Sequence, residues 1–419
     1  MLLDAMLQRF VKFGAITIVE AGGREKSWQG AEAGPVTKIR FTDDKVARDL
    51  LKNPELVVCE AYMDGRIEIL EGTLYEFLDF LIVNAEHQWQ AQRGTFRERI
   101  RLGLRKIQQY NPVGRAKQNI AHHYDLTDEF YRLFLDEDEQ YSCSYFPSPD
   151  IGLEESQLLK KRHIAAKLLL EPGQKVLDIG SGWGGLGLTI AELGGCDVTG
   201  VTLSERQHEV SNERARGKGV AERVRFLLQD YRHLRERFDR IVSVGMFEHV
   251  GVHHYDEFFG KVRDLLADDG VMLLHSIGRM EGPSWTSAFI RKYIFPGGYI
   301  PALSEVLPAI ERAGLWVTDV EILRLHYAET LKHWRQRFMA RRDEAKALYD
   351  ERFCRMWEIY LIGSELFFRR QRGMVFQIQL AKDRHAVPLT RDYMVDTERA
   401  WRCADQHAGL RTVGGRDAA

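Results

Sequence analysis

A glycine-rich turn with the sequence VLDIGSGWG (residues 176–184) is the strongest signal of a ligand site in the chain. Asp178 precedes Gly180, Ser181 and Gly182 within it. Glycine adopts positive φ angles easily and lets a ligand approach the backbone closely. The apolar residues before the turn predict a buried strand, and open α/β sheets bind ligands at the carboxyl ends of their strands. We therefore expect this turn to hold a nucleotide-like cofactor.

Two features argue against a dinucleotide. The glycines are spaced G-x-G-x-G rather than G-x-G-x-x-G, and the next strand ends in Thr202-Leu203-Ser204, without the acid that would bind a ribose diol. The turn resembles the first motif of class I S-adenosylmethionine-dependent methyltransferases. On that resemblance it lies against the methionine part of the cofactor, hydroxyl and amide groups replace the missing acid near the ribose, and Asp230 and Tyr231 meet the adenine.

The residues expected to bind S-adenosylmethionine come from the turn, from the ends of neighbouring strands and from a segment upstream of the sheet. They are Tyr141, Ser142, Asp178, Gly180, Ser181, Gly182, Thr202, Leu203, Ser204, Gln207, Asp230, Tyr231 and Val244. For Asp230 and Tyr231 a simple turn is the alternative interpretation. No metal site is predicted.

A second group of motifs indicates the methyl acceptor. These are HHYD (122–125), QYSCSYF (140–146), GMFEHVG (245–251), LHSIG (274–278) and FPGGYIP (295–301). Together they resemble cyclopropane-fatty-acyl-phospholipid synthases and the related mycolic acid cyclopropane synthases, from about His122 to Leu380. The small unit that precedes them resembles the bacterial phospholipid-acting branch of the family.

The resemblance implies that an alkene attacks the sulfonium methyl group directly and leaves a carbocation on the acyl chain. Aromatic rings stabilise such a cation by roughly 2 kcal/mol each where water is excluded. Aromatic residues in the motif segments are candidates for this role, with simple core packing as the alternative: Tyr124, Tyr141, Phe146, Phe247, Tyr299 and Tyr327.

Ring closure also requires a weak base, which in this family is a bound bicarbonate ion. The resemblance assigns its ligands to Cys143, Glu248, His275, the backbone of Ile277, and Tyr327. His275 and Tyr327 can donate hydrogen bonds to the ion, and Glu248 can accept one from it. Cys143 is alternatively a small buried hydrophobe, and His275 alone would fit a core histidine. The assignment of Tyr327 depends on residues 324–327 forming the end of a strand.

The order of elements predicts the fold class. From residue 171, five β-branched apolar runs (175–180, 196–203, 224–230, 238–245 and 270–278) alternate with helical stretches, which predicts a mostly parallel sheet covered on both faces. A strand at 316–325, a helical insertion at 328–372 and a last strand at 374–382 follow. The expected fold is a Rossmann-like α/β methyltransferase domain with helical insertions, preceded by a small α+β domain.

The chain of 419 residues is expected to form two domains. Residues 1–83 form the small domain, which the resemblance implies engages lipid, with strands at 14–23 and 36–41, a helix at 46–53, a strand, turn and strand over 55–70, and a helix at 71–83. Residues 84–120 form a basic helical linker, 121–383 the catalytic domain, and 384–419 a polar tail that packs loosely or peripherally.

Charge separates the linker from the rest of the chain. Between Arg93 and Lys117 eight basic residues face one acid, Glu98, although the net charge of the whole chain is −2. A solvated helical linker explains this stretch, as does a surface that meets the anionic headgroups of an unsaturated phospholipid membrane. Nucleic acid is not expected as a partner, because aromatic residues are few among these charges.

The remaining features indicate a cytoplasmic protein that associates peripherally with the inner membrane surface. We find neither a secretory signal nor an apolar stretch long enough to span a membrane, and the five cysteines suggest reduced thiols. The family resemblance implies a homodimer. An aromatic stripe (Tyr349, Phe353, Trp357, Tyr360 and Phe367) fits a helix packed in the core, with the wall of an acyl tunnel as the alternative.

Three rival functions stay open. One is methylation or methenylation of the acyl chain without ring closure. Another is methyl transfer to a soluble O or N nucleophile, and the third is a non-catalytic lipid-binding protein with a degenerate cofactor fold.

Overall fold

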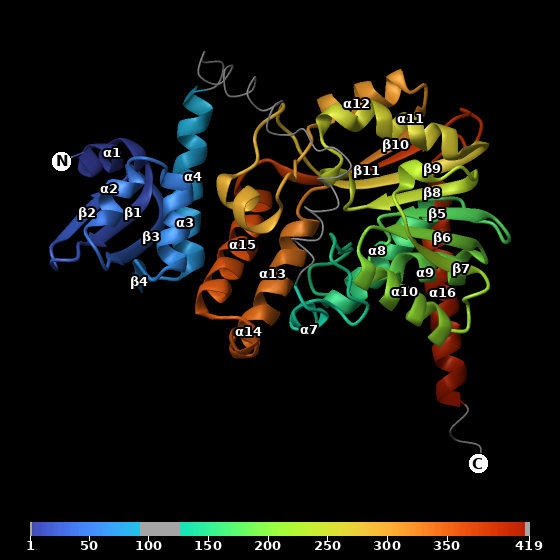
Figure 1. Ribbon diagram of the computed structural model, residues 1–419, viewed down its shortest axis with the longest axis horizontal. Coiled ribbons are helices and arrows are strands. Elements are labelled where there is room, and N and C mark those ends of the chain that lie inside the picture. The colour runs from blue at the N-terminus through green and yellow to red at the C-terminus, as the bar shows by residue number, and fades with distance from the viewer. Residues whose placement is uncertain (1, 93–125, 415–419) are drawn as a thin grey trace.

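Two β-sheets organise the chain in the computed structural model, which describes residues 2–92 and 126–414 (Figure 1). A four-stranded sheet belongs to the N-terminal domain and a seven-stranded sheet to the larger domain. The basic stretch from Arg93 to Lys117 and the residues His122–Asp125 lie outside the described residues.

The N-terminal domain packs helices against a mixed sheet with the strand order β2-β1-β3-β4. Its elements are α1 (Leu2–Phe10), β1 (Phe13–Val19), β2 (Glu25–Gln29), β3 (Glu32–Phe41), α2 (Lys45–Leu50), α3 (Pro54–Met63), β4 (Ile67–Glu71) and α4 (Leu74–Gln92). Strand β1 pairs parallel with β3 and antiparallel with β2. Alternating residues of β1, including Ile16 and Ile18, are buried, so one face of the sheet forms the core of the domain.

One predicted strand of this domain is wrong, because the segment from residue 55 is helical. Helix α3 begins after Asn53, whose side chain accepts a hydrogen bond from the Leu56 amide, and Pro54 occupies the first helical position. These start signals outweigh the β-branched pair Val57 and Val58, which favours a strand.

Helix α4 continues to Gln92 and its middle belongs to the N-terminal core. The buried Asn84 side chain accepts hydrogen bonds from the amides of Lys12 and Phe13 at 2.7 and 3.0 Å and donates to the carbonyls of Phe13 and Phe80. Because all of its hydrogen-bonding capacity is used, Asn84 joins the start of β1 to α4 at a fixed position.

The seven-stranded sheet confirms the predicted alternation of strands and helices. Its order is β10-β11-β9-β8-β5-β6-β7. Strands β9, β8, β5, β6 and β7 are parallel, β11 is antiparallel to β9, and β10 is antiparallel to β11 and so runs in the direction of the parallel strands. The strands are β5 (Lys175–Ile179), β6 (Asp197–Thr202), β7 (Val224–Leu228), β8 (Phe238–Val244), β9 (Leu266–Arg279), β10 (Trp316–Leu323) and β11 (Gly373–Ala381).

Helices cover both faces of this sheet, as Figure 1 shows. One face carries α8 (Leu153–Lys167), α9 (Gly185–Gly194) and α10 (Glu205–Gly217), and the other carries α11 (Tyr255–Leu265) and α12 (Leu303–Arg312). Short helical turns lie at the edge: α7 (Asp128–Tyr131), η1 (Tyr231–His233), η2 (Phe247–His249), η3 (Val252–His254) and η4 (Ile290–Ile294). The central strands are buried from both sides, as expected for parallel strands.

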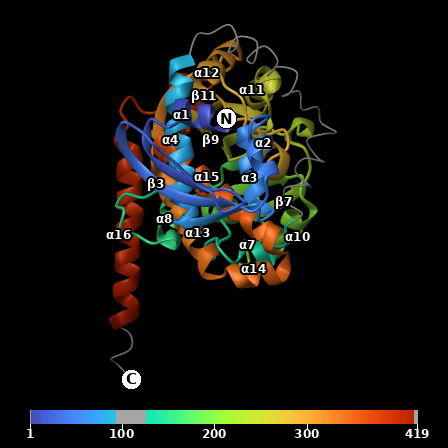
Figure 2. The same cartoon turned by 90° about the vertical axis from the view of Figure 1, so that its left-hand side faces the viewer.

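The predicted helical insertion forms three helices between β10 and β11. They are α13 (His326–Ala340), α14 (Arg342–Leu348) and α15 (Glu351–Arg370). Helix α15 packs against α3 and α4, so the insertion separates the N-terminal sheet from the large sheet (Figures 1 and 2). Arg370 donates two hydrogen bonds to Asp79 at 2.8 and 2.9 Å, and Tyr62 donates one to Glu358 at 2.9 Å.

The C-terminal region packs more specifically than the sequence predicts. Helix α16 (Asp392–Gly414) lies against α8, with Met394 buried and Trp401 packed on the apolar cluster of α8 and α9. Glu398 Oε1 lies 2.6 Å from His163 Nδ1. The expected loose tail is therefore a helix held by a buried polar contact.

Candidate functional site

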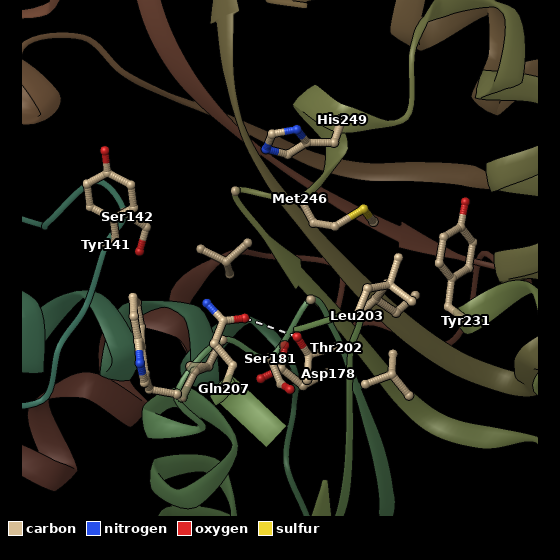
Figure 3. A pocket seen from close by; sticks show the side chains of 18 of the residues that line it. Tyr141, Ser142, Asp178, Ser181, Thr202, Leu203, Gln207, Tyr231, Met246 and His249 are labelled. Atoms are coloured by element: carbon tan, nitrogen blue, oxygen red, sulfur yellow. Dashed lines mark hydrogen bonds between the residues drawn. The ribbon is translucent and has the colours of Figure 1, made fainter. Parts of the chain in front are cut away.

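A cavity lies at the carboxyl ends of β5, β6 and β8, with its lining side chains shown in Figure 3. Residues at the ends of these three strands and just after them form most of the wall, together with residues 229–232 after β7 and residues 139–142. Of the expected cofactor-binding residues, those that line the cavity are Tyr141, Ser142, Asp178, Gly180, Ser181, Gly182, Thr202, Leu203, Gln207, Asp230, Tyr231 and Val244.

The glycine turn has the backbone shape that the sequence predicts. Gly180, Gly182 and Gly184 have φ angles of 84°, 54° and 84°, in the region that favours glycine. A Cβ atom on Gly180 would lie 2.8 Å from Met246 Cβ, whereas one on Gly182 would meet no atom within 4 Å. The turn therefore packs tightly at Gly180 and is open at Gly182, where a ligand can approach the backbone.

Two buried polar atoms border this turn. Asp178 Oδ2 and Ser181 Oγ have no hydrogen-bond partner among the described residues. Burial raises the pKa of Asp178 to about 7, although the charge of Lys160 opposes the shift. A buried carboxylate without a partner is costly, and a ligand that donates hydrogen bonds would satisfy it. The amino group of S-adenosylmethionine is a donor of this kind, so the wall fits the cofactor.

The residues at the end of β6 and just after it either line the cavity or cap the next helix. Thr202 Oγ1 donates to Gln207 Oε1 at 3.0 Å, the contact drawn in Figure 3, and both residues line the cavity. Ser204 is not among the described lining residues, which differs from its expected role at the ribose. Its hydroxyl accepts a hydrogen bond from the Gln207 amide and caps the start of α10.

Asp230 is engaged by its neighbour Arg232. The Arg232 guanidinium donates to both carboxylate oxygens, at 3.0 and 2.7 Å. Burial opposes the charge of the carboxyl, but the hydrogen bonds from Arg232 outweigh it and lower the pKa of Asp230. Asp230 is thus a buried anionic acceptor in the cavity lining, while the phenol of Tyr231 lies apart from the glycine turn in Figure 3.

The segment 136–142 is held in place by charged residues of α8 and α10. Lys161 forms an ion pair with Asp138 at 2.6 Å, and Arg214 contacts the same carboxylate. Lys160 is almost fully buried and donates to Gln140 Oε1 and Ser142 Oγ, both at 2.7 Å. These contacts place Gln140, Tyr141 and Ser142 against the cavity.

Sequence reasoning missed several residues of this wall. Gln140, Trp183, Met246 and His249 line the cavity beside predicted residues, and their position next to the motifs could have indicated them. Lys160 had no such signal, because a lysine in the polar sequence EESQLLKK is typical of an exposed helix face. Burial lowers the pKa of Lys160 to about 8.

The five residues expected to hold bicarbonate are absent from the described cavity lining, but each is close to it. Cys143 follows Ser142, Glu248 precedes His249, and His275 pairs with Val244 across β8 and β9. Glu248 Oε1 accepts a hydrogen bond from the Ile277 amide at 2.7 Å. Glu248 therefore contacts Ile277 of β9, the strand that also carries His275.

The Glu248 carboxyl is buried, with the Ile277 amide and the Ser276 side chain as polar neighbours. Burial raises its pKa to about 7, against the hydrogen bond from the Ile277 amide, and Glu248 Oε2 has no hydrogen-bond partner among the described residues. The backbone of Ile277, which is expected to bind the ion, contacts its neighbours: the amide donates to the Glu248 carboxylate, and the carbonyl accepts from Ser276 Oγ at 3.0 Å. Ile277 thus orients Glu248.

Tyr327 is buried but is not at the end of a strand. Strand β10 ends at Leu323, and Tyr327 lies in the first turn of α13, with its ring packed on Trp334 and Phe368. Trp334 stacks on Tyr141 at 5.1 Å between ring centroids. The expected strand end is therefore wrong, and Tyr327 reaches the neighbourhood of the cavity wall from a helix.

Cys143 is buried beside the same wall. Its thiol donates to the Ser144 carbonyl, at 3.3 Å between sulfur and oxygen, and burial raises its pKa above the ordinary range. A protonated thiol in this setting does not compete for a methyl group.

The other expected aromatic residues lie in different surroundings. Tyr141 lines the cavity and its hydroxyl lies 2.7 Å from that of Tyr360. Phe247 stacks on Tyr255 within the core under α11, and Phe146 stacks on His333. Packing explains these two rings, and Tyr124 lies outside the described residues.

The aromatic stripe of the insertion mostly packs inside the larger core. Trp357 and Tyr360 are buried, and Phe353 and Trp357 both pack on Phe130 of α7, at 5.1 and 5.0 Å between ring centroids. Because Tyr360 also reaches Tyr141, the stripe supports the cavity wall from behind.

Comparison with known proteins agrees with this architecture. The family described as mycolic acid cyclopropane synthetase matches residues 113–378, and residues 3–93 match a domain of unknown function, DUF7884. A probable fatty acid methyltransferase of Pseudomonas putida is 40% identical over 287 residues, which cover 66% of this chain and 73% of the relative. The cyclopropane-fatty-acyl-phospholipid synthase of Escherichia coli K12 is 36% identical over 344 residues, 82% of this chain and 87% of the relative.

A solved structure supports the same relationship. Mycolic acid cyclopropane synthase CmaA1, complexed with SAH and CTAB, is 36% identical with a TM-score of 0.61, and the match covers 65% of this chain and 99% of that chain. The larger domain therefore has the S-adenosylmethionine-dependent methyltransferase fold, preceded by a separate small α+β domain. Because the family match extends over more than half of the sequence, the chain belongs to the mycolic acid cyclopropane synthetase family and is a methyltransferase of this group.

Proposed function

We propose that this protein transfers a methylene group from S-adenosylmethionine to the cis double bond of an unsaturated acyl chain in a membrane phospholipid and forms a cyclopropane ring. The observation that carries the proposal is the buried carboxyl of Glu248, which lies beside the cofactor cavity with one oxygen lacking a hydrogen-bond partner among the described residues. A methyltransferase that only positions a nucleophilic lone pair does not need such a group.

The cavity residues would hold the cofactor by complementary groups. Asp178 and Ser181 offer acceptors to its amino group, the backbone at Gly182 allows close approach, and Asp230 offers a further acceptor in the cavity lining. S-adenosylmethionine supplies an electrophilic methyl group on a sulfonium centre when it is bound. The chain itself contributes orientation, which alone accounts for a large part of many rate enhancements.

Aromatic residues at the cavity would exclude water and stabilise the positive charge that forms on the acyl chain. Tyr141 presents its ring at the cavity, backed by the stacked Trp334 and by the hydroxyl of Tyr360. A ring face near a carbocation contributes roughly 2 kcal/mol in a dry environment. Because Trp334 and Tyr360 fix the position of Tyr141, this support is present before the substrate arrives.

Ring closure requires loss of a proton from the added carbon. Bicarbonate would supply a weak proton acceptor, held by Glu248, His275, Tyr327 and Cys143. The fit rests on Glu248 Oε2, a buried acceptor without a partner among the described residues, which suits the ion's O–H group. The Ile277 amide donates to Glu248 Oε1 and so orients the carboxyl that would accept from the ion.

The proposal is tested by incubating the purified chain with S-adenosylmethionine and vesicles of a phospholipid that carries cis-unsaturated chains. We expect acyl chains heavier by the mass of one methylene group, about 14 Da, together with loss of the vinylic proton signals. Soluble O and N nucleophiles serve as controls in the same assay. Methyl transfer to those acceptors with no change in the vesicle lipid would refute the proposal.

Acyl-chain methylation without ring closure is the second candidate. The Pseudomonas putida relative, at 40% identity, is named a probable fatty acid methyltransferase, which favours this alternative. The same assay separates the two functions, because a methyl branch gives a methyl proton signal and a cyclopropane gives the upfield signals of ring protons.

We also propose that the basic stretch binds anionic headgroups and brings the protein to the inner face of the membrane. No helix of residues 2–92 and 126–414 has the length and apolar character to cross a bilayer. Replacing Arg97, Arg99 and Arg101 by Ser should weaken vesicle binding, most clearly at low salt, because screening shortens the range of charge attraction. Unchanged binding in a flotation assay would make the stretch a plain linker. The homodimer stays a prediction.

A further inference from the structure

A glutamine on the last strand of the large sheet contacts the histidine of the proposed site. Gln377 on β11 is the register partner of His275 on β9, and both side chains are buried. Gln377 Nε2 lies 3.1 Å from His275 Nδ1. An amide can present either its oxygen or its nitrogen to a histidine, so the orientation of Gln377 decides which imidazole nitrogen carries the proton.

Lys167 fixes that orientation. Its ammonium group lies 2.6 Å from Gln377 Oε1. An ammonium group has three N–H donors and no acceptor, so it requires the oxygen of the amide. The amide nitrogen of Gln377 must then face His275 and donate to Nδ1.

Burial lowers the pKa of Lys167, and the neighbouring Glu321 carboxylate opposes that shift. Lys167 forms an ion pair with Glu321 Oε2, which also lies 2.7 Å from His163 Nε2. Burial works against the charge of Glu321, but the hydrogen bond from His163 and the charge of Lys167 outweigh it and lower the pKa of that carboxyl. An ionised Glu321 stabilises the protonated lysine beside it.

We infer that Gln377 is a positioning residue that holds His275 in the neutral tautomer with its proton on Nε2. This inference rests on the proposed function for its purpose, because an Nε2 proton makes His275 a donor to a bound oxyanion. The low pKa of His275 agrees with a neutral ring: burial lowers it well below the ordinary value, and the charges of Lys160 and Lys167 act in the same direction.

The strand offers a matched control two residues away. Gln379 is also buried, and its side chain donates to the Lys167 carbonyl at 2.6 Å and to the Tyr393 hydroxyl at 2.7 Å. It accepts from Thr318 Oγ1 at 2.8 Å. Gln379 is thus a buried, fully hydrogen-bonded glutamine of the same strand, and none of these bonds involves His275.

The test follows the histidine nitrogens in the full-length protein. With ¹⁵N-labelled histidine, the correlation pattern between ring nitrogens and ring protons distinguishes the two tautomers, and loss of one signal set in His275→Asn assigns His275. We expect the Nε2–H pattern in the wild type. We expect Gln377→Glu to give an Nδ1–H or a doubly protonated ring, because a carboxylate facing Lys167 has no N–H to offer Nδ1.

Two further variants keep the test decisive if a buried glutamate prevents folding. Gln377→Met removes the donor without adding charge and should mix the tautomers, whereas Gln379→Met should leave the Nε2–H pattern unchanged. An Nδ1–H pattern in the wild type, or the wild-type pattern in every Gln377 variant, would overturn the inference. An equal change in Gln379→Met would also overturn it, since the effect would then come from general loosening of β11.

Turnover separates this inference from the function on which it rests. Residues that orient a site group from behind typically change activity by about 10- to 100-fold when they are replaced. Gln377→Glu should therefore lower kcat on vesicles of unsaturated phospholipid by about that factor, with little change in KM. If His275→Asn keeps full activity while the tautomer pattern responds to Gln377, the proposed role of His275 fails and the positioning contact stands. If the tautomer of His275 does not respond to changes at Gln377 but His275→Asn is inactive, the positioning role of Gln377 fails and the proposed role of His275 stands.

Discussion

The cofactor wall and the polar layer beside it differ in what they are built from. The wall consists of strand ends, an open backbone turn, hydroxyl and amide groups around Asp178, and the ion pair of Asp230 with Arg232, and it borders a cavity. The polar layer contains Glu248 and His275, each buried, and no described lining residue belongs to it.

The difference lies in what surrounds a buried carboxyl, because Asp178 in the wall and Glu248 in the polar layer carry a similar burial cost. A glycine turn needs only a backbone shape, which local sequence determines. A buried carboxyl such as Glu248 destabilises the fold when it is ionised, and a sequence keeps such a group where function requires it. The wall is therefore built for binding, and we expect the layer beside it to matter for turnover.

Replacing Glu248 gives the largest expected effect on activity and the clearest separation of the two regions. Glu248→Gln keeps an acceptor for the Ile277 amide but removes the ionisable group, so ring formation should fall by about 1,000-fold, within the range of acid–base contributions. Cofactor affinity, measured by calorimetry, should change less than about twofold. Equal losses of binding and turnover would mean that the two regions are one unit and that Glu248 is structural.

The same variant should make the protein more stable at neutral pH. Burial raises the pKa of Glu248 from 4.5 to about 7, so the folded state holds a proton that the unfolded state releases. Stability is then greatest below pH 4.5 and falls as the pH rises through 7, by about 3 kcal/mol from this one group. Denaturant unfolding of Glu248→Gln and wild type should show the variant gaining that difference between pH 4.5 and 7. If the difference in unfolding free energy between Glu248→Gln and the wild type stays constant from pH 4.5 to 7, the buried carboxyl does not have the cost assigned to it.

Closing the open side of the turn should affect binding. Gly182 has a φ of 54° with free space where a side chain would point, so Gly182→Val adds both backbone strain and bulk at the cavity. We expect cofactor affinity to fall by about 100-fold, corresponding to roughly 3 kcal/mol. Gly217→Ala, at another open glycine far from the turn in sequence, is the control and should bind normally. Normal binding by Gly182→Val would place the cofactor elsewhere.

Sequence reasoning predicted the wall well because its signals are local. The strand, the glycines and Asp178 follow one another within nine residues, and β5 with its turn has the predicted form. The sheet was predictable for the same reason, since each strand is a continuous apolar run. Helix α3 was mispredicted because Val57 and Val58 favour a strand, and only the capping by Asn53 with Pro54 indicates otherwise.

The contacts of the polar layer could not be predicted, because their partners are far apart in sequence. Gln377 is 102 residues from His275, and Lys167 is 210 residues from Gln377. No spacing rule connects them, and Lys160 and Lys167 look like ordinary surface lysines of α8. Tyr327 was assigned to a strand end for a related reason, since the transition from β10 to α13 has no strong signal.

Removing the lysine that supports the wall at residues 140 and 142 should give a moderate effect. Lys160→Met removes two hydrogen bonds to Gln140 and Ser142, which line the cavity, and leaves both acceptors without this donor. Unsatisfied buried groups cost about 1–3 kcal/mol each, so cofactor affinity should fall by about 10-fold. Lys218→Met, at an exposed lysine with a single long ion pair of 3.8 Å, is the control. Undiminished cofactor affinity in Lys160→Met would mean that the position of residues 140–142 does not affect cofactor binding.

The smallest effect is expected at Ser204 and decides between two roles for one hydroxyl. As a cap, Ser204 satisfies the Gln207 amide at the start of α10, so Ser204→Ala should lower the free energy of unfolding by about 1 kcal/mol. Cofactor affinity should not change, because Ser204 lies outside the described lining while Thr202 and Gln207 lie within it. Ser204→Asp, which keeps a capping oxygen, should restore stability. A loss of affinity in Ser204→Ala with stability intact would instead assign this hydroxyl to the ribose and extend the binding wall to the first turn of α10.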